Sequence, residues 1–205
     1  MICAIAIMLI FSEVCIAAGT SYYGTGEYAG SAPVKPTTGL NFYVDYSAIS
    51  TYGSNPFTAA FDWNGNYTAS VGSIAQYPAS ASSYSTYFLI NADPNMLSYV
   101  RGETFYYDSS GSCINGTVTY PMDQQNIYKC KISINKNTSA FMVNNAFSDT
   151  YLRKVITHEV GHVFLLKHPS NNYCSSIMHQ GVPNAQISSS VTSEDRNNLR
   201  TKWGY

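Results

Sequence analysis

Three of the four histidines in this chain lie within eleven residues of one another, in the segment HEVGHVFLLKH at 158–168. His158 and His162 are four residues apart, so on a helix their imidazoles lie one turn apart on the same face. Neutral imidazole nitrogens are common zinc ligands, and a catalytic zinc takes three protein ligands and leaves a fourth position for water. The spacing therefore predicts that His158 and His162 bind one zinc ion.

Glu159 places a carboxylate beside the first of these two ligands. A bound cation lowers the pKa of its water from about 15.7 towards about 7. A neighbouring carboxylate can then accept the proton of that water and deliver it to a leaving amine. The pattern H-E-x-x-H on a helix thus predicts Glu159 as the general base of a zinc hydrolase.

His168 is the expected third ligand, and it requires the chain to reverse direction. It follows His162 by six residues, so on a continuous helix its side chain would be rotated by about 240° and would point away from the metal. The helix must therefore end between the two histidines. Two alternatives remain open: Glu194 or Asp195 replaces His168 as a distant carboxylate ligand, or the histidines bind no metal and face solvent or the core.

The segment from His158 to His168 resembles the zinc signature of the metzincin peptidases, H-E-x-x-H-x-x-G-x-x-H. Those enzymes also have a tight turn that holds a methionine beneath the zinc, and Ser176-Ile177-Met178 resembles this Met-turn. The resemblance implies that Met178 is a hydrophobic floor under the metal and not a ligand. Leu165 stands where the family has glycine, at a reversal that favours a positive φ costing other residues about 1 kcal/mol or more.

The end of the chain, TSEDRNNLRTKWGY, resembles the last helix of matrixin-type catalytic domains. The resemblance implies a metzincin-like domain of three layers, with a mixed twisted sheet, a long zinc-binding helix, a Met-turn and a C-terminal helix. It also implies one catalytic Zn²⁺ and a protein or peptide substrate bound in extended conformation along a sheet edge. Structural Ca²⁺ is left open. Gln180 stands where astacins and serralysins have a tyrosine ligand, and neither it nor His179 is expected to bind the zinc.

Strand-forming residues dominate the chain before these motifs. Aromatic and β-branched runs predict strands at 40–49, 70–76, 84–92, 103–107, 116–120 and 128–135, with a short helix at 55–63. Apolar residues then recur at helical spacing over 151–166, after the favoured N-cap Ser148, which predicts the long helix that carries the histidines. A second helix, capped by Thr192 or Ser193, closes the chain. Strands first and helices later predict an α+β fold.

The first 39 residues differ in composition from the rest. Residues 2–11 are ten apolar residues, too few to span a bilayer but suited to the core of a secretory signal, and Ala17 and Ala18 provide a cleavage site. We therefore expect a signal peptide at 1–18, a flexible lead-in or short propeptide at 19–39 and a catalytic domain at 40–205.

Cleavage of that signal leaves three cysteines, Cys113, Cys130 and Cys174. In an oxidising compartment one disulfide is expected, and Cys113 with Cys130 is favoured because the two flank a short, strand-rich segment. The sequence alone leaves all three pairings open.

The composition limits the class of partner. The 11 Lys and Arg residues almost balance the 12 Asp and Glu residues, which argues against a broad nucleic-acid surface or a stable membrane anchor through basic residues. The sequence thus predicts a secreted, monomeric zinc endopeptidase. Two rivals remain: a catalytically inactive zinc-binding structural or cell-surface module, and an aminopeptidase, for which no residue suited to binding a free α-amine is evident.

Overall fold

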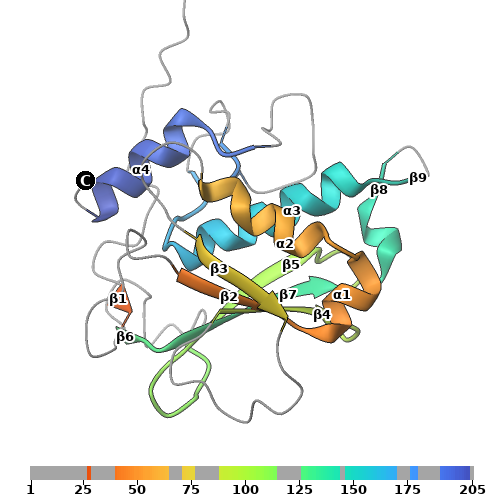
Figure 1. Ribbon diagram of the computed structural model, residues 1–205, viewed down its shortest axis with the longest axis horizontal. Coiled ribbons are helices and arrows are strands. Elements are labelled where there is room, and N and C mark those ends of the chain that lie inside the picture. The colour runs from red at the N-terminus through yellow and green to blue at the C-terminus, as the bar shows by residue number, and fades with distance from the viewer. Residues whose placement is uncertain are drawn as a thin grey trace, which may run out of the picture.

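The computed structural model describes residues 27–28, 40–64, 71–76, 88–114, 126–143, 146–169, 176–179 and 190–203. A five-stranded mixed sheet underlies this part of the chain, and helices lie along one side of it (Figure 1). All of the described strands precede the two longest helices in the sequence. The described structure is therefore an α+β fold, as the sequence predicted.

Four parallel strands and one antiparallel edge strand make up the sheet. In order across the sheet they are β3 (Val71–Gln76), β2 (Leu40–Val44), β4 (Phe88–Asp93), β7 (Lys129–Asn135) and β5 (Gly102–Tyr107). β5 runs antiparallel to β7, whereas the other neighbouring pairs are parallel. Four of the predicted strands are confirmed as β3, β4, β5 and β7, and the predicted strand at 116–120 lies outside the described residues.

Two further pairs of short strands lie outside this sheet. β1 (Glu27–Tyr28) pairs with β6 (Asn126–Ile127), and β8 (Met142–Val143) pairs with β9 (Ala146–Phe147).

The predicted strand at 40–49 is wrong in its second half. β2 ends at Val44, and the helix α1 (Tyr46–Tyr52) follows almost at once. Asp45 is the reason, because its Oδ1 accepts a hydrogen bond from the N–H of Ser47 at 2.8 Å and so caps the helix. The capping side chain satisfies a main-chain donor of the first helical turn, which the apolar pattern of the segment did not reveal.

The core lies between the sheet and the long helix α3 (Asp149–Val163). On β5 the hydroxyl of Tyr106 donates to the main-chain oxygen of His162 in α3 at 2.7 Å, and Thr104 Oγ1 lies 3.0 Å from the main-chain oxygen of Glu159. Directly paired residues of neighbouring strands share a face of the sheet. The buried apolar residues of the central strands therefore face α3 as well: Phe42, Val44, Ile90, Ala92, Ile132 and Ile134.

The N-terminus of α3 is capped as predicted, because Ser148 Oγ accepts a hydrogen bond from the N–H of Tyr151 at 3.2 Å. The predicted helix at 55–63 is also confirmed. It forms as α2 (Asn55–Phe61) followed by a 3-10 turn, and the indole Nε1 of Trp63 in that turn donates to the main-chain oxygen of Thr157 at 2.8 Å. This buried hydrogen bond holds α2 against α3.

The last helix, α4 (Ser193–Trp203), begins with a reciprocal cap. The N–H of Thr192 donates to Asp195 Oδ2 at 2.8 Å, and the N–H of Asp195 lies 3.4 Å from Thr192 Oγ1. This pattern is a capping box, which confirms Thr192 as the residue that starts the helix.

The expected disulfide between Cys113 and Cys130 is wrong. The main chain of Cys113 pairs with that of Tyr107 in an isolated β-bridge on one side of β5. Cys130 pairs with Tyr106 on the other side, within β7. β5 thus lies between the two cysteines, and two strand spacings place their Cα atoms about 9–10 Å apart. A disulfide spans at most about 7 Å between Cα atoms. Neither of these two cysteines is in a disulfide, and Cys174 lies outside the described residues.

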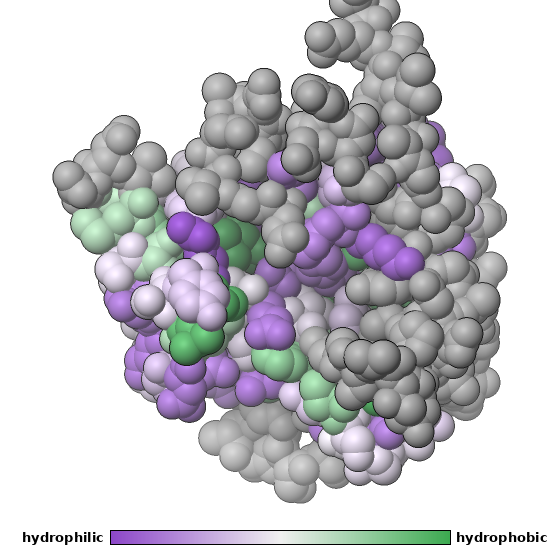
Figure 2. Space-filling view, turned by 180° about the vertical axis from the view of Figure 1, so that it is seen from behind, coloured by the Kyte–Doolittle hydropathy of each residue, from purple (hydrophilic) through white to green (hydrophobic). Residues whose placement is uncertain are grey.

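Exposed apolar side chains are scattered over the described surface. Figure 2 shows the molecule from behind, and its green areas are separated by purple, hydrophilic ones among the coloured residues. None of the described helices combines the length and the apolar character that crossing a bilayer requires. The expected signal peptide at 1–18 and nearly all of the expected lead-in at 19–39 lie outside the described residues.

Candidate metal centre

The structure brings His158, His162 and His168 together at their Nε2 atoms. The three Nε2–Nε2 distances are 3.0, 3.1 and 3.2 Å, which makes a nearly equilateral triangle. A point about 1 Å above the plane of this triangle is about 2.0–2.1 Å from all three nitrogens, the usual Zn–N distance. These three residues form a group that could hold a metal ion. The reversal that the sequence required for His168 is therefore present.

Hydrogen bonds at the opposite ring nitrogens set the protonation of two of these histidines. Nδ1 of His158 lies 2.8 Å from the main-chain oxygen of Ile177, and Nδ1 of His162 lies 2.8 Å from that of Leu166. A carbonyl oxygen only accepts, so each Nδ1 carries the hydrogen and each Nε2 keeps its lone pair. Lone pairs so close together repel one another unless a cation lies among them. The donor set therefore fits a divalent metal ion.

Burial favours the neutral, metal-binding form of the same two rings. Burial lowers the pKa of His158 to about 4, with a smaller contribution from the charge of His168. Burial also holds the pKa of His162 well below its usual range. At neutral pH both imidazoles are therefore unprotonated, which is the form that coordinates a metal.

Leu165 makes the chain reversal that returns His168 to the site. Its φ is 63°, the one positive φ at a non-glycine residue in the described part of the chain. The N–H of Leu165 bonds the oxygen of His162 at 2.8 Å, and the N–H of Leu166 bonds the oxygen of Gly161 at 3.1 Å. These two bonds form a Schellman motif that ends α3 at Val163, three residues before the predicted end at 166.

A leucine can occupy this left-handed position because its side chain is fully buried. Burying a leucine contributes about 1.5–3 kcal/mol, which exceeds the cost of about 1–2 kcal/mol for the left-handed conformation. The positive φ expected from the sequence at this position is confirmed, and the residue type is explained by packing.

Met178 is buried against α3 at Gly161. A Cβ on Gly161 would lie 2.2 Å from Met178 Sδ and 2.7 Å from Cζ2 of Trp63, so only glycine permits this approach. Met178 lies in the turn 176–179, in which the N–H of His179 lies 3.3 Å from the oxygen of Ser176. Met178 is thus buried beneath α3, and its role as a hydrophobic floor under a metal ion stays a prediction.

Asp195 of α4 holds this turn in place. Its Oδ1 accepts from Ser176 Oγ at 2.5 Å, and its Oδ2 accepts from the N–H of Ile177 at 3.1 Å. Since the oxygen of Ile177 in turn accepts from His158, a short chain of bonds connects α4 to one of the clustered rings. Asp195 is buried and fully engaged in this role, and neither it nor Glu194 belongs to the ligand group. His168 thus occupies the position for which the two carboxylates were alternatives.

The carboxyl group of Glu159 packs against β5. Its Oε2 accepts a hydrogen bond from Thr104 Oγ1 at 2.8 Å, and a Cβ on Gly102 would lie 2.9 Å from its Oε1. Burial raises the pKa of Glu159 to about 8, against the opposing effect of the hydrogen bond from Thr104. The carboxyl group of Glu159 is therefore held against the antiparallel edge strand of the sheet.

Several residues that position the site were not expected from the sequence. Thr104, Gly102 and Asp195 act on the site from distant segments, and no local spacing identifies such a partner. Of these three residues, only Asp195 could be recognised from the sequence, because an acidic residue three positions after Thr192 is typical of a capping box. The sequence pattern predicted the cap and gave no sign that the same carboxylate binds the turn.

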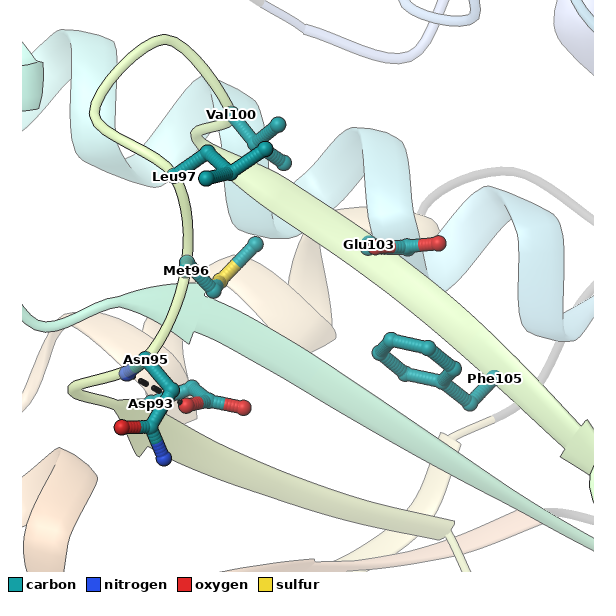
Figure 3. Close-up of a pocket in the computed structure, with 7 residues that line it drawn as sticks. All are labelled: Asp93, Asn95, Met96, Leu97, Val100, Glu103 and Phe105. Carbon is teal, nitrogen blue, oxygen red and sulfur yellow. Dashed lines mark hydrogen bonds between the residues drawn. The ribbon is translucent and has the colours of Figure 1, made fainter.

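A separate hollow lies beneath the segment between β4 and β5. Its volume is about 220 Å³, and Figure 3 shows Leu97 and Val100 on that segment above Phe105 and Glu103 of β5. Because Thr104 faces α3, its neighbours Glu103 and Phe105 line the opposite face of the sheet. The hollow contains none of the three clustered histidines and is distinct from the candidate metal centre.

Comparisons with known proteins add little. No family model matches the chain, and no curated protein matches it. Ten chains of solved structures match it. One is a chain of a structure described as the GM1-bound form of the ECX AB5 holotoxin, with 16% identity and a TM-score of 0.39 over 86% of this chain and 84% of that chain. Similarity at this level is too low to carry a statement about fold or function.

Proposed function

We propose that this chain is a secreted, monomeric zinc endopeptidase with a metzincin-like domain. The observation that carries the proposal is the convergence of His158, His162 and His168, whose Nε2 atoms lie 3.0–3.2 Å apart. A site with three protein ligands leaves a fourth position for water, as catalytic zinc sites do. The antiparallel edge strand, the long helix and the methionine turn beneath it agree with a metzincin-like architecture.

The three histidines would hold the zinc ion, which when bound would polarise the scissile carbonyl and lower the pKa of a water molecule. The charge of the bound zinc would favour the carboxylate form of Glu159 over the protonated form that burial favours, so that Glu159 would accept the proton of that water and later donate it to the leaving amine. Thr104 fixes the carboxyl group of Glu159 through its hydroxyl, at 2.8 Å. Glu159 thus has a defined orientation on the side of the cluster that faces β5.

An extended substrate would bind along the first part of β5, the edge strand of the described sheet, because residues 113–114 already pair with its end at Tyr106 and Tyr107. Main-chain hydrogen bonds would provide affinity, and alternate side chains of the substrate would enter pockets that select the sequence. The position of Glu159 beside Gly102 and Thr104 supports this placement, because it puts the proposed general base next to that strand.

The decisive variant is Glu159→Gln, assayed with zinc-loaded protein on casein and on a peptide library. We expect zinc content to remain at one ion per chain while cleavage falls by about 10²-fold or more. Unchanged cleavage would reject Glu159 as the base. A wild-type chain that binds zinc and cleaves nothing would favour the alternative, a structural or cell-surface zinc module.

A further inference from the structure

Lys154 is a buried cation to which the described residues offer no hydrogen bond. It lies in α3 with 7% of its surface exposed, and its Nζ makes no hydrogen bond within the part of the chain that the structure describes. Burial lowers the pKa of the Lys154 ammonium group to about 8, so the group remains mainly charged at neutral pH. A buried charge normally has an opposite charge or hydrogen-bond acceptors around it, because removing it from water is costly.

The cations near Lys154 in the described structure are engaged elsewhere. Its neighbour in sequence, Arg153, forms an ion pair with Asp62. Arg101 lies over the ring of Tyr151 and donates to the oxygen of Ala140 at 3.1 Å. Lys154 therefore differs from these arginines because its charged group has neither a hydrogen bond nor an ion pair in the described structure.

The helix places Lys154 beside the histidine cluster. It precedes His158 by four residues, which is about one turn, or 5–6 Å along the axis of α3. On the helix surface it is rotated about 40° from His158, on the side where Gly161 contacts Met178, whereas Glu159 lies on the other side. The charge of Lys154 reaches His158, since it contributes to the low pKa of that ring after burial and the charge of His168.

We propose that Lys154 is a specificity-determining residue that binds a carboxylate of the substrate close to the bond that is cleaved. This inference rests on the proposed function and specifies the substrate class of the same site. A carboxylate would supply the ion pair that the described residues do not provide, through charge-assisted hydrogen bonds in a water-poor environment. Glu159 and Lys154 would then lie on opposite sides of the metal, one acting on the proton and the other on the substrate.

Two sources can supply this carboxylate. One is an Asp or Glu side chain near the scissile bond, which would give an endopeptidase with a preference for acidic sequences. The other is the C-terminal carboxylate of a short peptide, which would restrict cleavage to bonds near the end of the chain. Both sources place the same group next to the same ammonium group, so they are separated by the peptides used in the test.

The test uses the zinc-loaded full chain and two matched series of fluorogenic peptides. In the first series Glu or Gln stands at each of three positions on either side of the bond, and every C-terminus is amidated. In the second series all side chains are neutral, and the C-terminus is either free or amidated. The enzymes are the wild type, Lys154→Met, Lys154→Arg and, as a control for charge alone, Lys136→Met at an exposed lysine on the β7 side of the sheet.

We expect the wild type to cleave the acidic member of one pair with kcat/KM about tenfold or more above that of its neutral partner. The ratio of kcat/KM for the acidic peptide to that for its neutral partner should fall to near one in Lys154→Met. The same ratio should stay high in Lys154→Arg and Lys136→Met. The pair that shows the effect identifies the source of the carboxylate. A wild type without preference in any pair, or a preference that survives Lys154→Met, overturns the inference while leaving the peptidase proposal intact.

Binding separates this inference from the proposed function. Anisotropy of the same labelled peptides is measured on zinc-loaded Glu159→Gln, with and without Lys154→Met, and circular dichroism confirms that each variant folds. If the wild type cleaves no peptide but binding still prefers the carboxylate through Lys154, the peptidase proposal fails and the carboxylate site remains. If neither cleavage nor binding distinguishes the pairs, the carboxylate site is rejected.

Discussion

The main-chain oxygen of Ile177 lies 2.8 Å from Nδ1 of His158, which connects the turn beneath α3 to one of the clustered histidines. The N–H of the same residue donates to Asp195 in α4 at 3.1 Å. A helix that contributes no ligand thus fixes the ring of a candidate metal ligand. Partners of this kind commonly affect metal affinity by 10–100-fold.

Replacing Asp195 by Ala should weaken zinc binding and stability together. The change leaves the N–H of Ile177 and the hydroxyl of Ser176 without their acceptor, at a cost of about 1–3 kcal/mol each. We expect the zinc affinity, measured by competition with a chelator, to fall by about tenfold or more. Asn197→Ala, at an exposed position of the same helix, is the control. Equal zinc affinities for the two variants would show that α4 does not position His158.

At position 165 a glycine substitution should be less destabilising than an alanine substitution, the reverse of the usual order within helices. Both Leu165→Ala and Leu165→Gly lose the buried side chain, but glycine alone relieves the strain of φ 63°. We therefore expect Leu165→Gly to be more stable than Leu165→Ala by about 1 kcal/mol in denaturant unfolding. Alanine proving the more stable substitute would mean that this residue does not hold a left-handed conformation in solution.

Gly161→Ala should destabilise the fold through Met178. The added Cβ would lie 2.2 Å from Met178 Sδ, so the turn must move, at a cost of about 1–3 kcal/mol. In the background Met178→Ala the same glycine substitution should cost about 1 kcal/mol less, a coupling that a double-mutant cycle measures by thermal unfolding. Strictly additive effects would place Met178 away from α3.

Lys154→Met should stabilise the protein in a pH-dependent way. At pH 7 the buried ammonium group has no hydrogen-bond partner among the described residues, so its removal should raise the free energy of unfolding by about 1–3 kcal/mol. The pKa of Lys154 is about 8 in the folded chain and 10.5 in its unperturbed state. Between these values the unfolded chain holds more protons, so wild-type stability rises with pH relative to the variant. The difference between the two proteins should therefore shrink from pH 8 towards pH 10.5, as measured by urea unfolding. A gap independent of pH would mean that Lys154 is not buried as a charge.

The parts of the site that depend on local sequence were predictable. The four-residue spacing of His158 and His162 and the cap at Ser148 define a helix and one face of it, because both are properties of neighbouring residues. The strained position at Leu165 was also visible, since the chain had to reverse before His168.

The residues that the sequence did not reveal act across the fold. Thr104 reaches Glu159 from 55 positions away, and the burial of Lys154 depends on what packs over α3. The disulfide prediction failed for a related reason, because the spacing of Cys113 and Cys130 says nothing of the strand that lies between them. The strand prediction at 40–49 failed locally, since the cap formed by Asp45 outweighed the apolar pattern.

Zinc K-edge X-ray absorption on the zinc-loaded full chain tests the central claim most directly, because it reports which atoms surround the metal. The predicted spectrum has three imidazole nitrogens and one oxygen of water at about 2.0–2.1 Å. His168→Ala should remove one imidazole shell and leave those of His158 and His162. A first shell that contains sulfur at about 2.3 Å, or one that is unchanged in His168→Ala, would contradict a three-histidine site with an open fourth position.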